Sequence, residues 1–276
     1  MPELPEVEVI CRGLAPHLEG LRLVAVAFGN QPLRLPMPAK PAIAQVVGQT
    51  VVAVTRRAKY IVITLENSAM IIIHLGMTGR LGFFPRGAEP AKHDHAVWRL
   101  NNQMELRFND TRRFGSVRIS GPDEDPGRLF ANLGPEPFWE AFSGEYLAGR
   151  AKGRTAPVKN FLMDNRIVTG IGNIYASEIL FAAGLNPTTP IGAIELATWR
   201  RVVVQSREIL TAAIACGGTT IANYVNSRGE KGYFQVRLRV YGRQGQPCRT
   251  CGEVLRKSVI GGRATFFCPV CQPPVL

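Results

Sequence analysis

The chain has 276 residues, 46% hydrophobic and 20% charged, a composition typical of a globular protein and too apolar for a disordered one. Lysine and arginine total 33 against 21 acidic residues, and the resulting net charge of +12 indicates a polyanionic partner, most simply nucleic acid. The sequence shows no membrane-spanning apolar run, no polybasic amphipathic helix and no charged-then-apolar leader, so we expect a cytoplasmic protein with no membrane partner.

The first residues place a proline and two glutamates at a predicted helix start. Apolar residues recur at helical spacing over 4–18. Removal of Met1 would expose Pro2 as a secondary amine, whose pKa lies well below that of a lysine and which can therefore attack an aldehydic carbon near neutral pH. Glu3 and Glu6 would supply the acid–base partner. Alternatively, this is an ordinary helix start, since prolines and acids both suit it.

Short β-type runs follow the helix, and with it they predict an antiparallel β-sandwich domain over residues 1–130. Gly, Pro and Asn separate the runs, and no helical pattern intervenes. The runs cover 21–28, 51–65, 70–75, 96–100, 104–108 and 116–119. A stretch rich in Pro, Gly and acids comes next, and we expect residues 131–150 to be a linker between domains.

The next part of the chain is predicted to be helical and to form a domain over residues 151–235. Helical spacing of apolar residues covers 156–164, 174–183 and 195–216. Gly217 and Gly218 would cap the last of these helices. Several glycines and few apolar residues occupy 217–235, which we expect to be a mobile loop.

Four of the six cysteines have the spacing of a zinc site. The pattern is Cys248-x2-Cys251-x16-Cys268-x2-Cys271. Four thiolates would hold one structural Zn²⁺ in a closed tetrahedron, and no organic cofactor is expected. Two disulfides are the alternative, which suits a reducing compartment less well. Residues 236–276 are therefore predicted to be a zinc-finger hairpin, whereas Cys11 and Cys216 are isolated and predicted to be small buried residues.

Several motifs follow one another along the whole chain, and through them the chain resembles the bacterial formamidopyrimidine-DNA glycosylases. The motifs are Met1-Pro2-Glu3-Leu4-Pro5-Glu6-Val7-Glu8, Arg57-Ala58-Lys59-Tyr60, His74-Leu75-Gly76-Met77-Thr78-Gly79, Asn109-Asp110-Thr111-Arg112-Arg113-Phe114-Gly115, Leu162-Met163-Asp164, Gly170-Ile171-Gly172-Asn173-Ile174-Tyr175-Ala176-Ser177-Glu178 and the cysteine pattern. The chain departs from the family pattern at Thr111, where many relatives carry proline. The resemblance implies an α+β fold with an N-terminal antiparallel β-sandwich flanked by helices, a C-terminal helix–two-turn–helix domain and a C-terminal β-hairpin zinc finger.

The resemblance also implies an activity: removal of oxidised purines (8-oxoguanine and formamidopyrimidines) from double-stranded DNA by a monomer, followed by cleavage of the abasic strand through β,δ-elimination. Pro2 would be the nucleophile that forms a Schiff base with C1′ of the deoxyribose. Glu3 would be the general acid and base, Glu6 would support the developing charge, and Lys59 would lie near the scissile phosphates. The alternative for both glutamates is a helix-end role without chemistry.

Base excision requires the damaged nucleotide to leave the duplex, and the resemblance assigns Met77, Arg112 and Phe114 to fill the space it leaves. An apolar thioether and an aromatic ring suit a wedge between bases, and an arginine can donate to the estranged base. The alternative is that Met77 and Phe114 are core residues, although the adjacent Gly76 and Gly115 indicate loop tips.

The family also implies a set of contacts to the DNA backbone. They are His74, His93, Lys159, Asn173, Tyr241 and Arg263. The alternatives are that the glycines before Asn173 only turn the chain, that His74 is structural, and that His93 belongs to a metal-like His93-Asp94-His95 group. Thr219, Thr220 and Tyr224 would belong to a loop that caps the lesion.

Two other functions fit part of the pattern. A sister enzyme of the same superfamily acts on oxidised pyrimidines, but Leu4 and the Arg112-Arg113-Phe114 segment favour the purine enzyme. A non-catalytic zinc-dependent DNA-binding protein would explain the charge and the cysteines, but not the start of the chain around Pro2.

Overall fold

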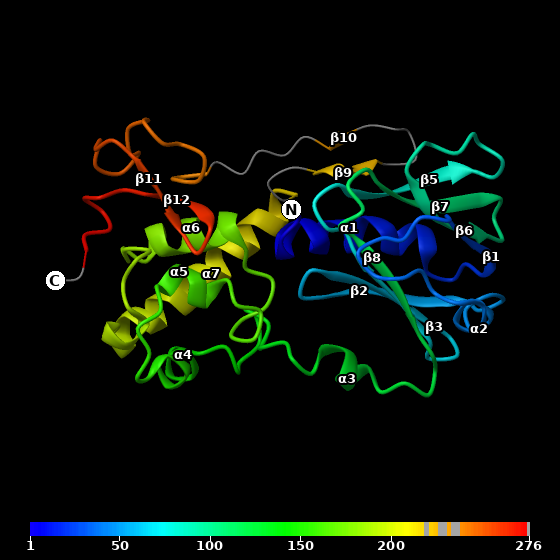
Figure 1. The fold of residues 1–276 in the computed structure, drawn as a ribbon, viewed down its shortest axis with the longest axis horizontal. Coiled ribbons are helices and arrows are strands. Elements are labelled where there is room, and N and C mark those ends of the chain that lie inside the picture. Colours follow the sequence, from blue (N-terminus) through cyan, green and yellow to red (C-terminus); the bar gives the residue numbers. More distant parts are fainter. Residues whose placement is uncertain (218–220, 226–230, 233–237, 275–276) are drawn as a thin grey trace. The chain divides into compact units, whose positions relative to one another are not determined.

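A computed structural model describes residues 1–217, 221–225, 231–232 and 238–274, which form two compact units (Figure 1). Unit 1 comprises Met1–Ala131 and Cys216–Gln235, and unit 2 comprises Asn132–Ala215 and Val236–Leu276. The predicted α+β class is confirmed, with largely antiparallel sheets, a helical region and a cysteine-bearing hairpin. None of the helices in the described ranges has the length and apolarity needed to cross a membrane.

The described residues of unit 1 form two β-sheets and three helices. Its elements are α1 (Leu4–Leu18), β1 (Leu23–Phe28), α2 (Lys40–Ala44), β2 (Val51–Arg57), β3 (Tyr60–Leu65), β4 (Met70–His74), β5 (Gly79–Pro85), β6 (Asp94–Leu100), β7 (Met104–Asp110), β8 (Ser116–Ser120), α3 (Pro126–Phe130), β9 (Ile221–Val225) and β10 (Lys231–Gly232). One sheet has the order β1-β6-β7-β5-β9-β10 and the other β2-β3-β4-β8. The described strand pairs are antiparallel except for β5 with β9.

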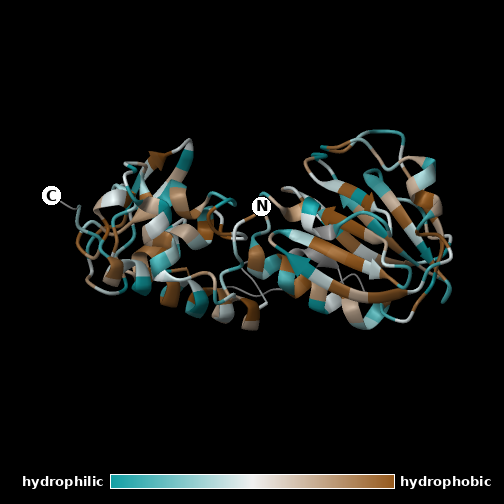
Figure 2. Ribbon diagram, turned by 90° about the horizontal axis from the view of Figure 1, so that it is seen from below, coloured by the Kyte–Doolittle hydropathy of each residue, from teal (hydrophilic) through white to brown (hydrophobic). Residues whose placement is uncertain are grey.

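A single hydrophobic core joins both sheets of unit 1 to α1, and Figure 2 shows the hydrophobic residues concentrated along its strands. The core contains Leu14 of α1, Ile71 of β4 and Trp98 of β6. Strand β4 is apolar without alternation because its other face is also covered: Ile72 packs in a second cluster with Phe130 of α3.

Helix α1 begins and ends where the apolar periodicity predicts, and it contacts β2. The Glu8 carboxylate accepts from Arg56 Nε at 3.0 Å, and Cys11 Sγ donates to the Thr55 carbonyl at 3.2 Å. Cys11 is buried as predicted, and burial raises its pKa to about 12, so it is an unreactive thiol. The same prediction is wrong for Cys216, which follows the last turn of a helix and is exposed.

Strand β5 is an element that the sequence patterns do not predict. Its glycines and final proline interrupt the β-type run, but β7 pairs with it along its whole length. Gly79 is required there, because a Cβ atom would lie 2.2 Å from the Leu75 carbonyl oxygen. The expected loop 217–235 also contains β9 and β10, so the expectation of a continuous loop is wrong where β9 pairs with β5. The rest of that loop lies outside the described residues.

Unit 2 is helical and ends in a two-stranded hairpin. Its elements are α4 (Gly144–Ala151), α5 (Val158–Leu162), α6 (Asn173–Ala182), the short 3-10 helix η1 (Ile191–Ala193), α7 (Leu196–Ala215), β11 (Arg256–Ile260) and β12 (Arg263–Phe267). The core between the helices includes the fully buried Tyr175 and Trp199. Gly217 follows α7 with φ +81°, the left-handed conformation expected of a helix-ending glycine.

Candidate active site and DNA interface

The chain start is folded into unit 1 as a capping box. Glu3 is the N-cap of α1, and its backbone N–H donates to Glu6 Oε2 at 2.9 Å in a reciprocal arrangement. Pro2, Glu3 and Glu6 are all buried; the glutamates are only 3% and 5% exposed. The structure therefore brings the predicted nucleophile and its two acids together in one ordered segment.

Lys59 lies in the two-residue turn between β2 and β3 and is 7% exposed. Arg56 connects this turn to α1, because its Nη1 donates to the Ala58 carbonyl at 3.0 Å while its Nε binds Glu8. Ala58 has φ +53°, a conformation that a non-glycine residue adopts only where the surroundings hold it. These contacts fix the turn, and with it the lysine, against the same helix that begins at the predicted active site.

Met77, Arg112 and Phe114 lie on two loops of unit 1, between β4 and β5 and between β7 and β8. Met77 is 44% exposed and Phe114 46% exposed, so the interpretation of both as core residues is not supported. The guanidinium of Arg112 lies 4.6 Å from the centre of the Phe114 ring. Two exposed apolar side chains with a stacked cation form a surface that can slide between bases.

His74 ends β4 with its ring 5.1 Å from that of Tyr60. Its Nδ1 accepts from the Gly76 N–H at 3.1 Å, so the neutral ring carries its proton on Nε2. Burial lowers the pKa of His74 to about 4, and the charges of Arg34 and Lys59 add to the effect. His74 therefore offers a neutral N–H donor in positive surroundings. It lines a cavity of about 230 Å³ with Arg34, Leu35, Tyr60, Ile72, Ser116, Arg118, Leu129 and Phe130.

His93 lies in the turn directly before β6, and its carbonyl accepts from the Asp110 N–H at 3.0 Å. His95 is buried and its Nε2 lies 2.9 Å from the Asp110 carbonyl oxygen, while Asp94 pairs with Arg107. Within the described part of the chain, the cysteine cluster alone groups three or more potential metal ligands. The metal-like appearance of this segment is therefore not supported.

In unit 2, Lys159 and Asn173 both bind the finger hairpin. Lys159 is fully buried; its Nζ donates to the Ala264 carbonyl at 3.0 Å and to Thr265 Oγ1 at 2.7 Å. Asn173, the first residue of α6, donates from Nδ2 to the same Ala264 carbonyl at 3.0 Å. These bonds fix the hairpin beside Arg263, which is exposed directly after the Gly261-Gly262 turn.

Tyr241 packs its ring 5.0 Å from Phe266 of the hairpin. Its position depends on Glu178 of α6, a buried residue for which the sequence pattern predicts no role. The Glu178 carboxylate accepts three backbone N–H groups: Arg239 at 2.8 Å, Val240 at 3.0 Å and Tyr241 at 2.8 Å. A lone glutamate in a helix carries no sequence signal for this role, because its partners lie more than sixty residues further along the chain.

Of the three residues predicted to cap the lesion, the structure describes only Tyr224. Thr219 and Thr220 lie outside the described residues. Tyr224 belongs to β9, where its backbone pairs with Leu81 of β5.

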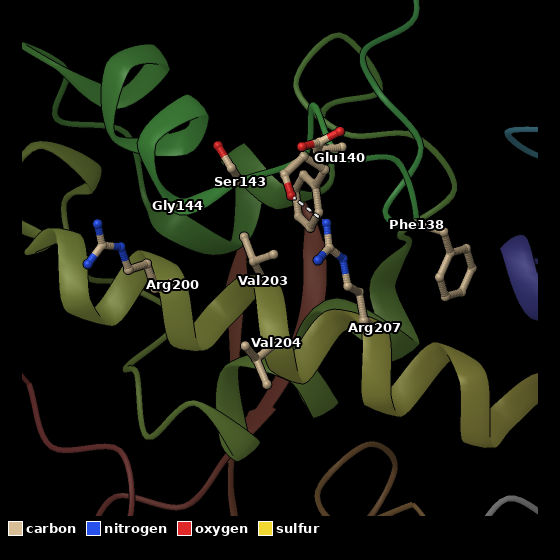
Figure 3. A pocket seen from close by; sticks show the side chains of 9 residues that line it. Phe138, Glu140, Ser143, Gly144, Arg200, Val203, Val204 and Arg207 are labelled. Carbon is tan, nitrogen blue, oxygen red and sulfur yellow. Dashed lines mark hydrogen bonds between the residues drawn. The ribbon is translucent and has the colours of Figure 1, made fainter.

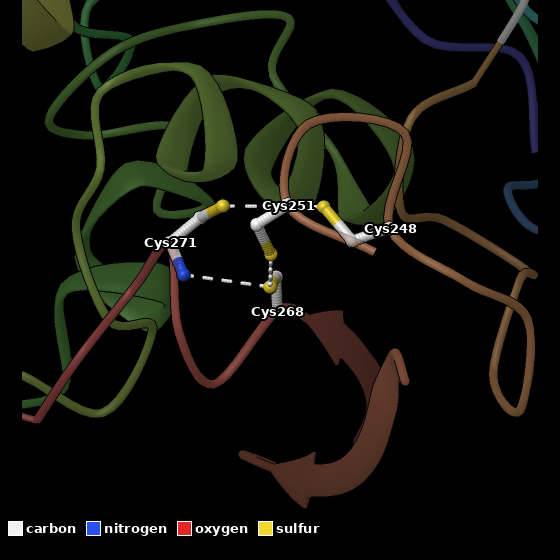
Figure 4. A group of neighbouring side chains, drawn as sticks. All are labelled: Cys248, Cys251, Cys268 and Cys271. Atoms are coloured by element: carbon white, nitrogen blue, oxygen red, sulfur yellow. Dashed lines mark hydrogen bonds between the residues drawn. The ribbon is translucent and has the colours of Figure 1, made fainter. Parts of the chain in front are cut away.

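The cysteine cluster has the dimensions of a zinc site (Figure 4). The four Sγ atoms lie within 4.8 Å of one another, with 3.9 Å between Cys248 and Cys271 and 3.4 Å between Cys251 and Cys268. A tetrahedron with Zn–S bonds of about 2.3 Å has edges of about 3.8 Å, so the thiolates fit one structural Zn²⁺. The predicted zinc ion is thereby supported, and the disulfide alternative is not, since all four cysteines are free thiols.

A cavity of about 490 Å³ lies on unit 2 between α7 and the segment before α4 (Figure 3). Arg207 holds this segment by donating to the carbonyls of Pro137, Trp139 and Phe142. Its lining includes none of the residues that the sequence predicted for a site. We therefore assign it no part in the chemistry.

Three domain families match the chain, and together they define it as a DNA glycosylase with a zinc finger. The formamidopyrimidine-DNA glycosylase N-terminal domain matches residues 1–117, the H2TH domain of the same enzymes residues 133–225, and the zinc finger found in FPG and IleRS residues 245–274. The chain belongs to the formamidopyrimidine-DNA glycosylase family, and AP lyase activity is part of that family. The non-catalytic alternative is therefore not supported.

Relatives and solved structures agree with this assignment. The formamidopyrimidine-DNA glycosylases of Acidithiobacillus ferrooxidans and Xanthomonas oryzae pv. oryzae are 48% and 46% identical, and each alignment covers 99% of this chain and 100% of the relative. The Lactococcus lactis Fpg in complex with DNA containing an abasic site is 31% identical, covers 98% of this chain and 99% of its own, and has a TM-score of 0.88. A second complex of that enzyme, with DNA containing an oxidised pyrimidine, gives a TM-score of 0.89 at 30% identity over 99% of this chain and 100% of its own.

Proposed function

We propose that this protein removes oxidised purines, 8-oxoguanine and formamidopyrimidines, from double-stranded DNA through a Schiff base on Pro2. The observation that carries the proposal is the ordered chain start: Pro2 is buried beside Glu3, whose N–H is bound by Glu6. The electron pair on the proline nitrogen becomes available once Met1 has been removed. A nucleophile held next to two carboxylates has both the attacking group and the proton carriers that glycosidic cleavage needs.

The steps follow from this arrangement. The Pro2 nitrogen bonds to C1′, the bond from C1′ to the base breaks, and a proton delivered through Glu3 neutralises the leaving group. The proton lost from the Pro2 nitrogen passes through Glu3 to O4′, the C1′–O4′ bond breaks, and the opened sugar is left as an iminium cation that the carboxylate of Glu6 stabilises. Loss of a proton from C2′ then breaks the C3′–O bond, and loss of a proton from C4′ breaks the C5′–O bond. Water releases the sugar remnant from Pro2.

The DNA contacts are proposals of the same kind. Lys59 and His74 of unit 1 and Asn173, Tyr241 and Arg263 of unit 2 suit phosphate oxygens because each offers an N–H or O–H donor. We propose His93 as a further phosphate contact of unit 1. Lys159 is fully buried and its Nζ is bound to the hairpin that carries Arg263, so in place of the expected phosphate contact we propose that it supports DNA binding by holding that hairpin. Met77, Arg112 and Phe114 fill the space of the extruded nucleotide, and Thr219, Thr220 and Tyr224 cap the lesion.

Borohydride trapping tests the nucleophile. The protein is incubated with an 8-oxoguanine duplex and borohydride, and the crosslinked peptide is mapped by mass spectrometry. We expect the sugar remnant on Pro2 of a chain that lacks Met1, and Pro2→Gly should slow its formation while leaving DNA affinity largely intact. Glu3→Gln should abolish excision and retain binding. A crosslink on any other residue would contradict the assignment.

A second candidate is excision of oxidised pyrimidines, favoured by the Lactococcus lactis complex with DNA containing an oxidised pyrimidine. Parallel single-turnover assays on 8-oxoguanine and thymine-glycol duplexes separate the two substrates. We expect faster excision of 8-oxoguanine, and a preference for thymine glycol would favour the second candidate. We further propose that the protein acts as a cytoplasmic monomer. The domain bounds 1–130, 151–235 and 236–276, with a linker at 131–150, remain predictions from the sequence; the compact units divide the chain differently, because Cys216–Gln235 belongs with Met1–Ala131.

A further inference from the structure

The two loops with the wedge residues touch through their backbones. Gly76, just before Met77, has φ +61°, and a Cβ atom there would lie 2.5 Å from the Gly115 nitrogen and from the Phe114 carbonyl carbon. Arg113 has φ +57°, a conformation that a non-glycine residue keeps only when surrounding contacts hold it. The two loops therefore form one surface feature. A left-handed conformation at Arg113 requires contacts that hold it, and a residue buried beneath the loops supplies them.

Asp110, at the end of β7, is fully buried and binds both loops with one carboxylate. Its Oδ1 accepts from the Thr78 hydroxyl and, at 3.3 Å, from the Arg112 N–H. Its Oδ2 accepts from the Gly115 N–H at 2.8 Å. The Thr78 oxygen also accepts from the Arg112 N–H, at 3.1 Å. Thr78, which follows Met77, and Arg112 and Gly115, which flank the Phe114 segment, are thus bound by the same buried carboxylate.

The backbone of Asp110 is itself held by the neighbouring strand. Its N–H donates to the His93 carbonyl at 3.0 Å, and its carbonyl accepts from His95 Nε2 at 2.9 Å. His95 is buried, so this bond is shielded from water. The His93 carbonyl and the His95 ring therefore hold the backbone of the aspartate in place.

We propose that Asp110 is a positioning residue that locks the Met77 loop and the Arg112–Phe114 loop into one preformed wedge for base extrusion. The inference rests on the proposed void-filling role of those loops. An ordered wedge enters the base stack without having to organise itself first, whereas two independent loops would have to become ordered during extrusion.

The test compares a reaction that needs extrusion with one that does not. Asp110→Asn removes the negative charge of the carboxylate and places an NH₂ group against one of the N–H or O–H groups that bind it. Thr78→Val removes the hydroxyl that connects Asp110 and the Arg112 N–H. We expect both variants to slow single-turnover excision of 8-oxoguanine from duplex DNA by about 10- to 100-fold. Strand cleavage at an abasic site in a single-stranded oligonucleotide should stay within about twofold of the wild type, because no base has to leave a stack there. Thr64→Val, a partly buried threonine on β3, is the matched control and should change neither reaction.

The outcomes separate this inference from the proposed function. Met77→Ala and Phe114→Ala test the wedge itself: if they leave duplex excision unchanged, the void-filling role fails and the positioning role with it. If they slow excision but Asp110→Asn and Thr78→Val do not, only the positioning role is overturned. Equal losses in the duplex and single-strand reactions would also overturn it, since they indicate general damage to the fold. Should Asp110→Asn fail to fold, Thr78→Val decides the question by the same comparison.

Discussion

The Glu178 carboxylate is the best point at which to test how unit 2 holds Tyr241. Glu178→Gln keeps one acceptor oxygen but replaces the other by an NH₂ group that faces a backbone donor. At least one of the three N–H groups of Arg239, Val240 and Tyr241 then loses its partner. A hydrogen bond to a charged group contributes about 1.5–3 kcal/mol, so we expect local opening of this segment to become easier by about 2–3 kcal/mol.

Amide hydrogen exchange measures that opening directly. A loss of 2–3 kcal/mol corresponds to exchange about 30- to 150-fold faster at residues 239–241. Glu208→Gln is the control, because Glu208 is exposed on α7 and its carboxylate binds only the side chain of Gln205 among the described residues. Exchange at 239–241 within about twofold of the wild type in Glu178→Gln would refute the reasoning, because the carboxylate would then contribute little to holding the segment.

Three further predictions concern pH, metal and salt. The pKa of His74 is lowered to about 4, below its unfolded value, so stability present above pH 6.5 is lost as the pH falls towards 4. The free energy of unfolding should fall by about 2 kcal/mol between pH 7 and pH 5 because of His74. Denaturant unfolding of the wild type and of His74→Gln at both pH values should show this difference, and an equal pH dependence in the two proteins would contradict the lowered pKa. Removal of zinc by a strong chelator, or Cys248→Ser, should unfold the hairpin and weaken binding to damaged and undamaged duplex alike, measured by circular dichroism and DNA titration; intact affinity would count against a structural metal. Arg263→Ala should reduce the salt dependence of duplex binding by about one phosphate contact, and an unchanged slope would remove Arg263 from the interface.

Sequence patterns predict the elements whose causes are local. The apolar periodicity gives the bounds of α1, and the cysteine spacing gives the zinc cluster, since both depend on residues close together in the chain. Strand β5 escapes prediction because Gly79, Gly82 and Pro85 weaken its pattern, while its pairing with β7 supplies the hydrogen bonds. Strand β9 has no local signal either, since its pairing with β5 joins residues far apart in sequence.

The same distinction applies to the candidate site. Residue types and motifs single out Pro2, Glu3 and the wedge residues, whose roles remain predictions. They do not single out Asp110 or Glu178, because an aspartate at a strand end and a glutamate in a helix are ordinary until the fold brings backbone N–H groups to them. Such supporting residues become visible only once contacts between distant segments are known.

The discontinuous composition of unit 1 bears on how the protein can be dissected. The second segment of unit 1, Cys216–Gln235, lies between the two segments of unit 2 in the sequence. The polypeptide therefore passes from one unit to the other three times. A fragment that stops at Ala131 would lack β9 and β10 and would leave the β5 edge without the partner that pairs at Leu81 and Gly82. Unpaired strand edges favour association between copies, so we expect such a truncation to aggregate, and fusing residues 216–235 back onto it should restore solubility.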